Sequence, residues 1–305
     1  MALYLGIDGG GTKTTCVVAD EYSILGTATS AGSNITRLGE IRVREALHAA
    51  VRDACAVAKL DAQQIDRACV GLSGAGRPEV REAVLHMMRE ILRGQIEVVT
   101  DLETTMQAAF GDGPGVITIA GTGSIAYGRD AQGRTARAGG WGLAISDEGS
   151  GQWIGRAAVS AVLNANDAGD DPPLLRTILS LWNLNSLDEL VRNANGSPPP
   201  DFSSLVPSTL AAAEANDPLA RHVLERAGNE LSALVRHVAR RLFAAEARVP
   251  VAMAGGVFRQ SELVRQIFYN KVTAEFPQAS VLPTIVDPAE GALALARKAQ
   301  SRQTR

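Results

Sequence analysis

The sequence has little of several features that would assign it to a specialised class of protein. Aromatic residues make up only 4% of its 305 residues. No apolar run approaches the roughly 20 residues that span a bilayer. Acidic residues (33) slightly outnumber basic residues (30), whereas proteins that hold nucleic acid mainly by charge usually have a basic excess. We therefore expect neither a membrane nor nucleic acid as a partner.

Cysteine is also scarce, and the spacing of the cysteines does not indicate a metal-binding site. Cys16, Cys55 and Cys69 form no CxxC pair and no set with metal-ligand spacing, which argues against a zinc site or an iron–sulfur cluster within one chain. We expect buried, reduced thiols. The chain runs from Met1 straight into a strand pattern with no basic region or cleavage site, which predicts a cytoplasmic protein.

The remaining composition is that of a folded soluble chain, with 46% hydrophobic and 21% charged residues. The length suggests about two domains at roughly 150 residues each. Glycine is the enriched residue, at 30 of 305, against a usual share of about 7%. Such an excess indicates close backbone approaches, in turns or around a ligand.

Hydrophobic periodicity predicts an α/β fold. An antiparallel meander of three strands is followed by alternating helices and strands, and a mostly helical second half carries one long helix after Asp217. The predicted strands are 3–8, 14–20, 24–28, 67–71, 97–100, 116–120 and 249–254, and the predicted helices include 40–59, 78–92, 104–110 and 288–298.

A strand–glycine–strand unit occurs twice. A shift of 112 residues places Ile7 on Ile119, Gly9 on Gly121, Gly11 on Gly123 and Thr12 on Ser124. We interpret this as an internal repeat of one supersecondary unit, although chance similarity between two glycine-rich hairpins remains an alternative.

The first candidate site is the loop at residues 8–13, Asp-Gly-Gly-Gly-Thr-Lys, directly after a strand. Glycines let successive backbone N–H groups approach an anion. Thr12 adds a hydroxyl and Lys13 a positive charge, and Asp8 can hold Mg²⁺ through water. The alternative is a plain hairpin turn. The predicted nucleotide-binding residues here are Gly10, Gly11, Thr12 and Lys13.

The repeat supplies a second such loop, and two loops facing each other would hold a polyphosphate from both sides. A further pair of glycines after the strand at 249–254 permits close contact with a base or ribose, or else forms a tight strand–helix turn. The predicted nucleotide-binding residues are Gly121, Thr122, Gly123, Ser124, Gly255 and Gly256.

Asp101 ends a short strand before a helix. Ligands of α/β sheets gather at the carboxyl ends of strands, so this carboxylate could accept the proton of a hydroxyl nucleophile. In phosphoryl transfer, orienting that hydroxyl matters more than deprotonating it early. The alternative is that Asp101 caps the following helix.

Trp141 stands among glycines, in Gly139-Gly140-Trp141-Gly142, and Asp147-Glu148 follows shortly after. An exposed flat ring suits a sugar face, and carboxylates suit sugar hydroxyls. The alternative is a core tryptophan with the Asp-Glu pair opening the next helix.

Together these segments resemble the N-acetylglucosamine kinases, within the sugar kinase/actin/heat-shock ATPase superfamily. "GIDGGGTKT" (6–14) and "TIAGTGSIAYGRD" (118–130) are similar to the two phosphate loops of the family, and "MAGGVF" (253–258) to its adenosine motif. "GGWGLAISDEGSGQWIG" (139–155) is the most specific segment. The resemblance covers nearly the whole chain.

The resemblance implies two ribonuclease H-like (actin-type ATPase) domains with a cleft between them, at residues 1–113 plus 288–305 and at 114–287. It implies ATP and Mg²⁺ as cofactors, and we expect a homodimer. Asp101 matches the catalytic base of the family, and Asp8 a metal-side carboxylate. Thr12, Thr122 and Gly256 match nucleotide contacts. The positions that match contacts to the amino sugar are Asn34, Gly140, Trp141, Gly142 and Asp147.

The expected reaction is ATP-dependent phosphorylation of N-acetyl-D-glucosamine at the 6-hydroxyl. Ser146 stands where the family pattern has glycine, which bears on the choice of sugar. Glucosamine or another hexose is the alternative acceptor. A second alternative is an ATPase switch without a sugar acceptor, like the related activators of 2-hydroxyacyl-CoA dehydratases, but their cluster-binding cysteines have no match here.

Overall fold

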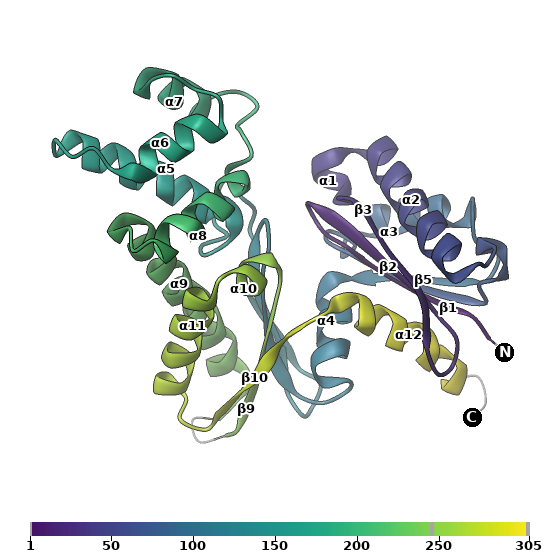
Figure 1. Ribbon diagram of the computed structural model, residues 1–305. Coiled ribbons are helices and arrows are strands. Elements are labelled where there is room, and N and C mark those ends of the chain that lie inside the picture. The colour runs from purple at the N-terminus through teal and green to yellow at the C-terminus, as the bar shows by residue number, and fades with distance from the viewer. Residues whose placement is uncertain (1, 245–246, 303–305) are drawn as a thin grey trace. The chain divides into compact units, whose positions relative to one another are not determined.

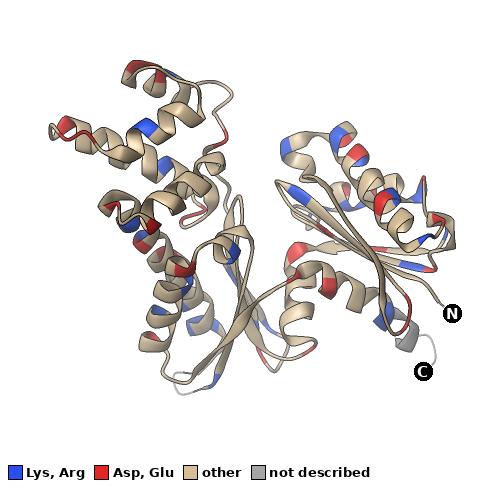
Figure 2. Ribbon diagram, viewed as in Figure 1, with Lys and Arg blue, Asp and Glu red and all other residues tan. Residues whose placement is uncertain are grey.

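The computed structural model describes residues 2–244 and 247–302, in two compact units (Figure 1). One unit comprises Met1–Ile117 with Val286–Arg305, and the other comprises Thr118–Ile285. Each is built around one five-stranded sheet. The strands of both sheets carry few charged residues, whereas charged residues recur along the helices (Figure 2). The fold is therefore α/β, as the sequence predicts.

The first sheet has the strand order β3-β2-β1-β4-β5. β1, β2 and β3 pair antiparallel, which confirms the predicted meander, and β1, β4 and β5 pair parallel. The strands are β1 (Tyr4–Gly9), β2 (Lys13–Ala19), β3 (Ile24–Ala31), β4 (Arg67–Leu72) and β5 (Gln95–Thr100).

Helices pack on this sheet over two apolar cores. One core contains the buried stripe of α2, including Val43, Leu47 and Val51, and the buried residues of α3. The other contains residues of α12, including Ala292 and Leu293. The helices of this unit are α1 (Ile35–Leu38), α2 (Glu40–Ala58), the short 3₁₀ helix η1 (Ala62–Gln64), α3 (Pro78–Arg89), α4 (Asp101–Phe110) and α12 (Pro288–Arg302).

The last helix, α12, packs closely because two glycines remove side chains from its contacts. A Cβ at Gly6 would collide with the backbone of Leu293, and a Cβ at Gly291 would collide with the carbonyl of Thr104 in α4. The final helix of the chain thus completes the first unit.

The second sheet, read from β8, has the order β8-β7-β6-β9-β10. That order corresponds strand by strand to β3-β2-β1-β4-β5, and it supports the internal repeat. The strands are β6 (Gly115–Ala120), β7 (Ser124–Arg129), β8 (Thr135–Gly139), β9 (Val249–Ala254) and β10 (Ala279–Val286). The sequence analysis did not predict β10.

A long helical insertion between β8 and β9 distinguishes the second unit. Its longest helix, α9, begins after the N-cap Asp217 and buries the predicted apolar stripe. The helices are α5 (Gly151–Asp167), α6 (Pro173–Leu181), α7 (Leu187–Ala194), the 3₁₀ helix η2 (Phe202–Leu205), α8 (Val206–Glu214) and α9 (Pro218–Leu242), and after β9 come α10 (Gly256–Gln260) and α11 (Glu262–Glu275).

The three cysteines are buried and free, as predicted. Burial raises the pKa of the Cys16 and Cys69 thiols well above their usual value, so both stay protonated. Within the described residues, none of the helices combines the length and the apolar character that crossing a membrane requires.

Candidate functional site

The first glycine loop is a short hairpin with a fixed backbone. The N–H of Gly10 donates to the carbonyl of Lys13 at 3.0 Å, and the N–H of Ser33 donates to the carbonyl of Gly10 at 2.9 Å. A Cβ at Gly32 would collide with the carbonyl of Gly11, so only glycine allows this approach. Thr12 and Lys13 are exposed. The loop therefore presents backbone, a hydroxyl and a cation on a rigid base.

Asp8 lies near the end of β1, just before this loop, and is half-buried. In residues 2–244 and 247–302, histidine, cysteine, aspartate and glutamate nowhere gather in a group of three or more that could hold a metal ion. Mg²⁺ commonly binds through one or two carboxylates together with waters and substrate phosphates. A lone carboxylate next to a phosphate-type loop fits that mode of binding.

The carboxyl ends of three strands lie in one row. Gly9 of β1 pairs with Leu72 of β4, and Leu72 pairs with Thr100 of β5. The residues that follow Leu72 and Thr100 are Ser73 and Asp101. The register therefore brings the predicted base beside a serine that the sequence analysis did not select.

Asp101 is the first residue of α4, which begins three residues earlier than predicted. The N-cap is Thr100, whose hydroxyl accepts from the N–H of Glu103 at 3.2 Å, while the Glu103 carboxylate accepts from the N–H of Thr100 at 2.8 Å. This capping box satisfies the helix start, so the alternative role of Asp101 as the cap is wrong.

Asp101 is half-buried. Burial raises its pKa to about 6, against the opposing effect of hydrogen bonds from the Leu102 N–H and the Ser73 hydroxyl. Leu102 N lies 3.0 Å from Asp101 Oδ1. Such a carboxyl is ionised at neutral pH and is a stronger base than an exposed aspartate.

Asn34 approaches the same place from the end of β3. It caps α1, and its Oδ1 accepts from the N–H of Arg37 at 3.2 Å. Its Nδ2 lies 3.5 Å from the Ser73 hydroxyl. Two predicted residues, Asn34 and Asp101, are thus linked through Ser73. A serine directly after a buried strand and before a glycine was the signal that could have identified it.

The second glycine loop, at 121–124, lies in the other unit and is held by the segment that follows β8. The N–H of Gly121 donates to the carbonyl of Gly123 at 2.9 Å, and the N–H of Gly151 donates to the carbonyl of Gly121 at 2.8 Å. The buried Ser124 hydroxyl donates to the carbonyl of Glu148 at 2.7 Å. The structure therefore joins two motifs that are separate in the sequence.

The glycines of this second site differ in the space around them. A Cβ at Gly121 would meet nothing within 4 Å, so the loop is open there. A Cβ at Gly255, with φ of +100°, would collide with the carbonyl of Ala120 at the end of β6. The predicted adenosine motif thus lies against the start of the second loop. Thr122 and Gly256 are half-buried.

Asp147 is a buried acidic residue with an unsatisfied oxygen. Its φ is +69°, a conformation that costs a non-glycine residue free energy and often marks a functional position. Within the described chain, its Oδ1 has no hydrogen-bond partner. Burial raises its pKa, against N–H donors from Gly142 and Ser124. A buried acceptor in this state fits a ligand that donates a hydrogen bond.

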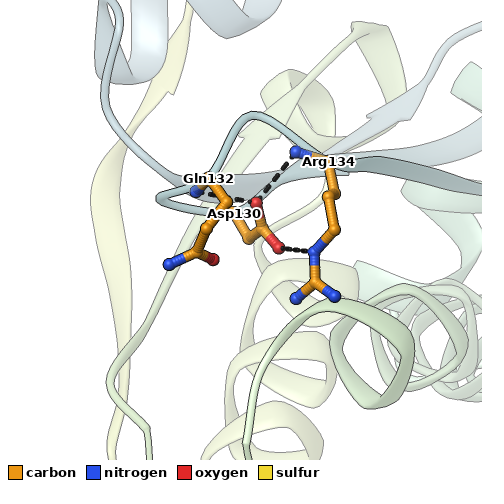
Figure 3. Close-up of polar contacts among 3 residues, drawn as sticks. All are labelled: Asp130, Gln132 and Arg134. Carbon is orange, nitrogen blue, oxygen red and sulfur yellow. Dashed lines mark hydrogen bonds and ion pairs between the residues drawn. The ribbon is translucent and has the colours of Figure 1, made fainter.

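Asp130, in the same unit, differs from Asp147 in the hydrogen bonding of its carboxylate. It lies in the turn between β7 and β8 and accepts hydrogen bonds from the N–H of Gln132 (2.9 Å), the N–H of Arg134 (2.9 Å) and Nε of Arg134 (2.6 Å) (Figure 3). Burial raises its pKa, but these hydrogen bonds more than offset it and the pKa is lowered. Asp130 therefore stabilises a hairpin, whereas Oδ1 of Asp147 is buried without a hydrogen-bond partner among the described residues.

Trp141 is 62% exposed, so the alternative of a core tryptophan is wrong. The guanidinium of Arg137 lies 4.3 Å from the centre of its ring. Gly140 and Gly142 flank it with φ of +68° and +103°. The helix after this segment begins at Gly151 with Ser150 as its N-cap, so the Asp-Glu pair does not open it.

The chain is similar to known sugar kinases over nearly its whole length. It is 30% identical over 302 residues to the N-acetylmuramic acid/N-acetylglucosamine kinase of Clostridium acetobutylicum, covering 97% of this chain and 99% of that protein. It is 28% identical to the N-acetyl-D-glucosamine kinase of Dictyostelium discoideum, covering 96% of this chain and 97% of that one.

A solved structure agrees with these matches. A protein of Chromobacterium violaceum that is proposed to be an N-acetylglucosamine kinase superposes with a TM-score of 0.77 at 27% identity, covering 97% of this chain and 99% of that one. Residues 5–296 match the BadF/BadG/BcrA/BcrD ATPase family. The chain, with its two glycine loops and its strand-end carboxylate, belongs to the BadF/BadG/BcrA/BcrD ATPase family.

Proposed function

We propose that this protein is an N-acetylglucosamine kinase that transfers the γ-phosphoryl group of ATP to the 6-hydroxyl of the sugar. The products are N-acetylglucosamine 6-phosphate and ADP. The observation that carries the proposal is the position of Asp101, a carboxylate that follows β5 at the same edge of the sheet as the first glycine loop, two strands away from it. The names of the two similar kinases support the choice of sugar.

The two glycine loops bind the phosphates of ATP in this proposal. The backbone N–H of Gly11 supplies a donor and Lys13 supplies positive charge, while the N–H groups of Gly10 and Gly121 fix the shape of the two hairpins. The open space at Gly121 supports this role, because a phosphate can approach the backbone there without meeting a side chain. Gly255 and Gly256 approach the adenosine. Asp8 would hold Mg²⁺, and the bound ion would supply positive charge near the phosphates.

The amino sugar binds to Asn34, Gly140, Trp141, Gly142 and Asp147. Arg137 lies over one face of the Trp141 ring. The ring is largely exposed, so its opposite face can contact the apolar face of the sugar. The unsatisfied Oδ1 of Asp147 accepts a hydrogen bond from a sugar hydroxyl.

Asp101 acts as the general base. It accepts the proton of the 6-hydroxyl as the bond from that oxygen to the γ-phosphorus forms and the bond to the β–γ bridging oxygen breaks. Its proton affinity is higher than that of an exposed aspartate, whose pKa is about 3.9, because its carboxyl is buried. The transition state is loose, so the carboxylate contributes mainly by orienting the hydroxyl.

A panel of acceptors assayed for ADP formation tests the proposal. N-acetylglucosamine, glucosamine, N-acetylmuramic acid and glucose are compared with a sample without sugar, and ³¹P NMR identifies the phosphorylated position. We expect N-acetylglucosamine to give the highest kcat/KM and a 6-phosphate. A preference for glucosamine or glucose would move the assignment to another hexose kinase. ATP hydrolysis that no sugar accelerates would contradict the kinase assignment and favour a nucleotide-driven switch.

A further inference from the structure

The Ser73 side chain lies between two residues of the proposed site. It follows Leu72 of β4, which pairs in parallel register with Thr100 of β5, so Ser73 and Asp101 extend the same row. Its N–H donates to the carbonyl of Gly9 at 3.1 Å, which ties it to the end of β1. The backbone around Ser73 is therefore fixed by two neighbouring strands.

The hydrogen bonds of its hydroxyl have a defined direction. Nδ2 of Asn34 can only donate, so at 3.5 Å it donates to Ser73 Oγ. The ionised carboxylate of Asp101 can only accept, so the Ser73 hydroxyl donates to it. The Oδ1 of Asn34 is already occupied by the N–H of Arg37. One ordered chain of donors thus runs from Asn34 through Ser73 to Asp101.

Among the described groups that affect the pKa of Asp101, Ser73 is the side chain that donates a hydrogen bond to the carboxylate. The N–H of Leu102 is a backbone donor. Glu103 is the titratable group that acts on Asp101, and its negative charge opposes ionisation. The Glu103 carboxylate is itself held by the N–H and the hydroxyl of Thr100, both at 2.8 Å.

We propose that Ser73 is a positioning residue that orients the Asp101 carboxylate toward the acceptor hydroxyl and couples it to Asn34. This inference rests on the proposed kinase function and deepens it. The Ser73 hydroxyl and the Leu102 N–H both donate to the Asp101 carboxylate and so restrict its orientation. Through Asn34, the same hydroxyl connects the base to a residue that binds the sugar.

Three variants test the role of Ser73 through the pH dependence of kcat/KM. Ser73→Ala removes the donor, and Ser73→Thr keeps it. Ser30→Ala is the matched control, because Ser30 is also half-buried in this unit but donates to the carbonyl of Ala46. Since a hydrogen bond to a charged group stabilises that charge, its loss raises the pKa of Asp101.

For Ser73→Ala we expect kcat/KM at pH 7 to fall about tenfold to a hundredfold, with the acidic limb moved upward by about one pH unit. Ser73→Thr should keep the wild-type limb, and Ser30→Ala should change neither quantity. An unmoved limb in Ser73→Ala, with the melting temperature unchanged, would overturn the proposal.

A second measurement does not depend on activity. The Asp101 carboxyl carbon is titrated by NMR in wild type and Ser73→Ala, with Asp101→Asn to assign the resonance. A higher pKa in Ser73→Ala supports the coupling, and an equal pKa overturns it. If wild type phosphorylates no sugar, the proposed function fails while this titration still decides whether Ser73 acts on Asp101.

Discussion

The two units share a strand order but place different chemistry at equivalent strand ends. β5 of the first sheet and β10 of the second occupy matching positions, and each is followed by an aspartate, Asp101 and Asp287. Asp287 accepts from the N–H of Ala289 at 3.1 Å and caps α12. Asp101 does not cap its helix, because Thr100 and Glu103 do so one residue earlier. A one-residue shift of the cap therefore makes the first carboxylate available for chemistry.

A second difference lies in the segments outside the repeat. The first unit joins β3 to β4 through α1 and α2 and β4 to β5 through α3, and its candidate residues lie at or near strand ends. The second unit adds the segment 139–150 and the helical insertion, and this addition carries Trp141 and Asp147. The repeat supplies two glycine hairpins, which we propose bind phosphate, and the added segment of the second unit supplies two of the proposed sugar contacts.

Among the variants that test this difference between the two units, we expect Asp101→Asn to have the largest effect. The amide keeps the size of the side chain but cannot accept the proton, so kcat should fall about a hundredfold to ten-thousandfold. Steady-state kinetics measure this, with circular dichroism to verify the fold. The matched control is Asp287→Asn, which keeps a capping side chain and should retain activity. Activity of Asp101→Asn within tenfold of wild type would remove this residue from the role of base.

Asp147→Asn tests the carboxylate of the other unit. The loss of a charged acceptor should lower kcat/KM for the sugar about tenfold to a hundredfold, mainly through KM. Because burial raises the pKa of Asp147, its ionised form costs stability at pH 7, and the variant should melt at the same or a higher temperature. Lower activity together with a lower melting temperature would indicate a structural role instead.

Alanine substitutions compare the glycines of the second loop. Gly121→Ala adds a methyl group to open space, so the fold should be unchanged while ATP binding weakens about tenfold by calorimetry. Gly123→Ala would place Cβ 2.7 Å from Oδ2 of Asp147, so it should lower the melting temperature as well. Gly10→Ala in the first loop, where the nearest atom is 3.6 Å away, should behave as Gly121→Ala does. Unaltered ATP affinity in both open-loop variants would contradict phosphate binding there.

The pH dependence of kcat/KM tests the carboxylate of the first unit. We expect the effect of Asp101 protonation on activity to be smallest at neutral pH and largest in acid. Since the pKa of Asp101 is raised to about 6, kcat/KM should fall about tenfold for each pH unit below that value. The stability of the protein changes in the opposite direction. Because folding raises the pKa of this carboxyl, the free energy of unfolding decreases as the pH rises from about 4 to about 6. Asp101→Asn should lack this stability trend, and its persistence there would assign the trend to another group.

The fold was largely predictable because its elements are strongly periodic. The meander, α2 and the stripe of α9 are each encoded by local hydrophobic spacing and by caps such as Asp217. β10 was missed because it is mostly half-buried or exposed and includes Pro283, so it lacks the apolar run of a central strand. Tertiary pairing, rather than local preference, makes it a strand.

The candidate residues that belong to a sequence motif were predictable. Those that are brought to the site only by tertiary contacts were not. Glycine loops and strand-end acids are visible as spacing. The link from Ser73 to Asn34 spans 39 residues, and the placement of Ser73 next to Asp101 depends on the register between β4 and β5. The positive φ of Asp147 and the tie between Gly121 and Gly151 are likewise invisible in a list of residues.

The contact between α12 and β1 has a consequence for biosynthesis. One face of the first sheet, with Tyr4, Val17 and Val99, is buried by residues from 289 onward. During translation this face emerges long before its cover, and it stays exposed to solvent or chaperones until the ribosome has finished the final helix. Truncation before Pro288 should therefore yield an aggregating product even though the glycine loops are all present.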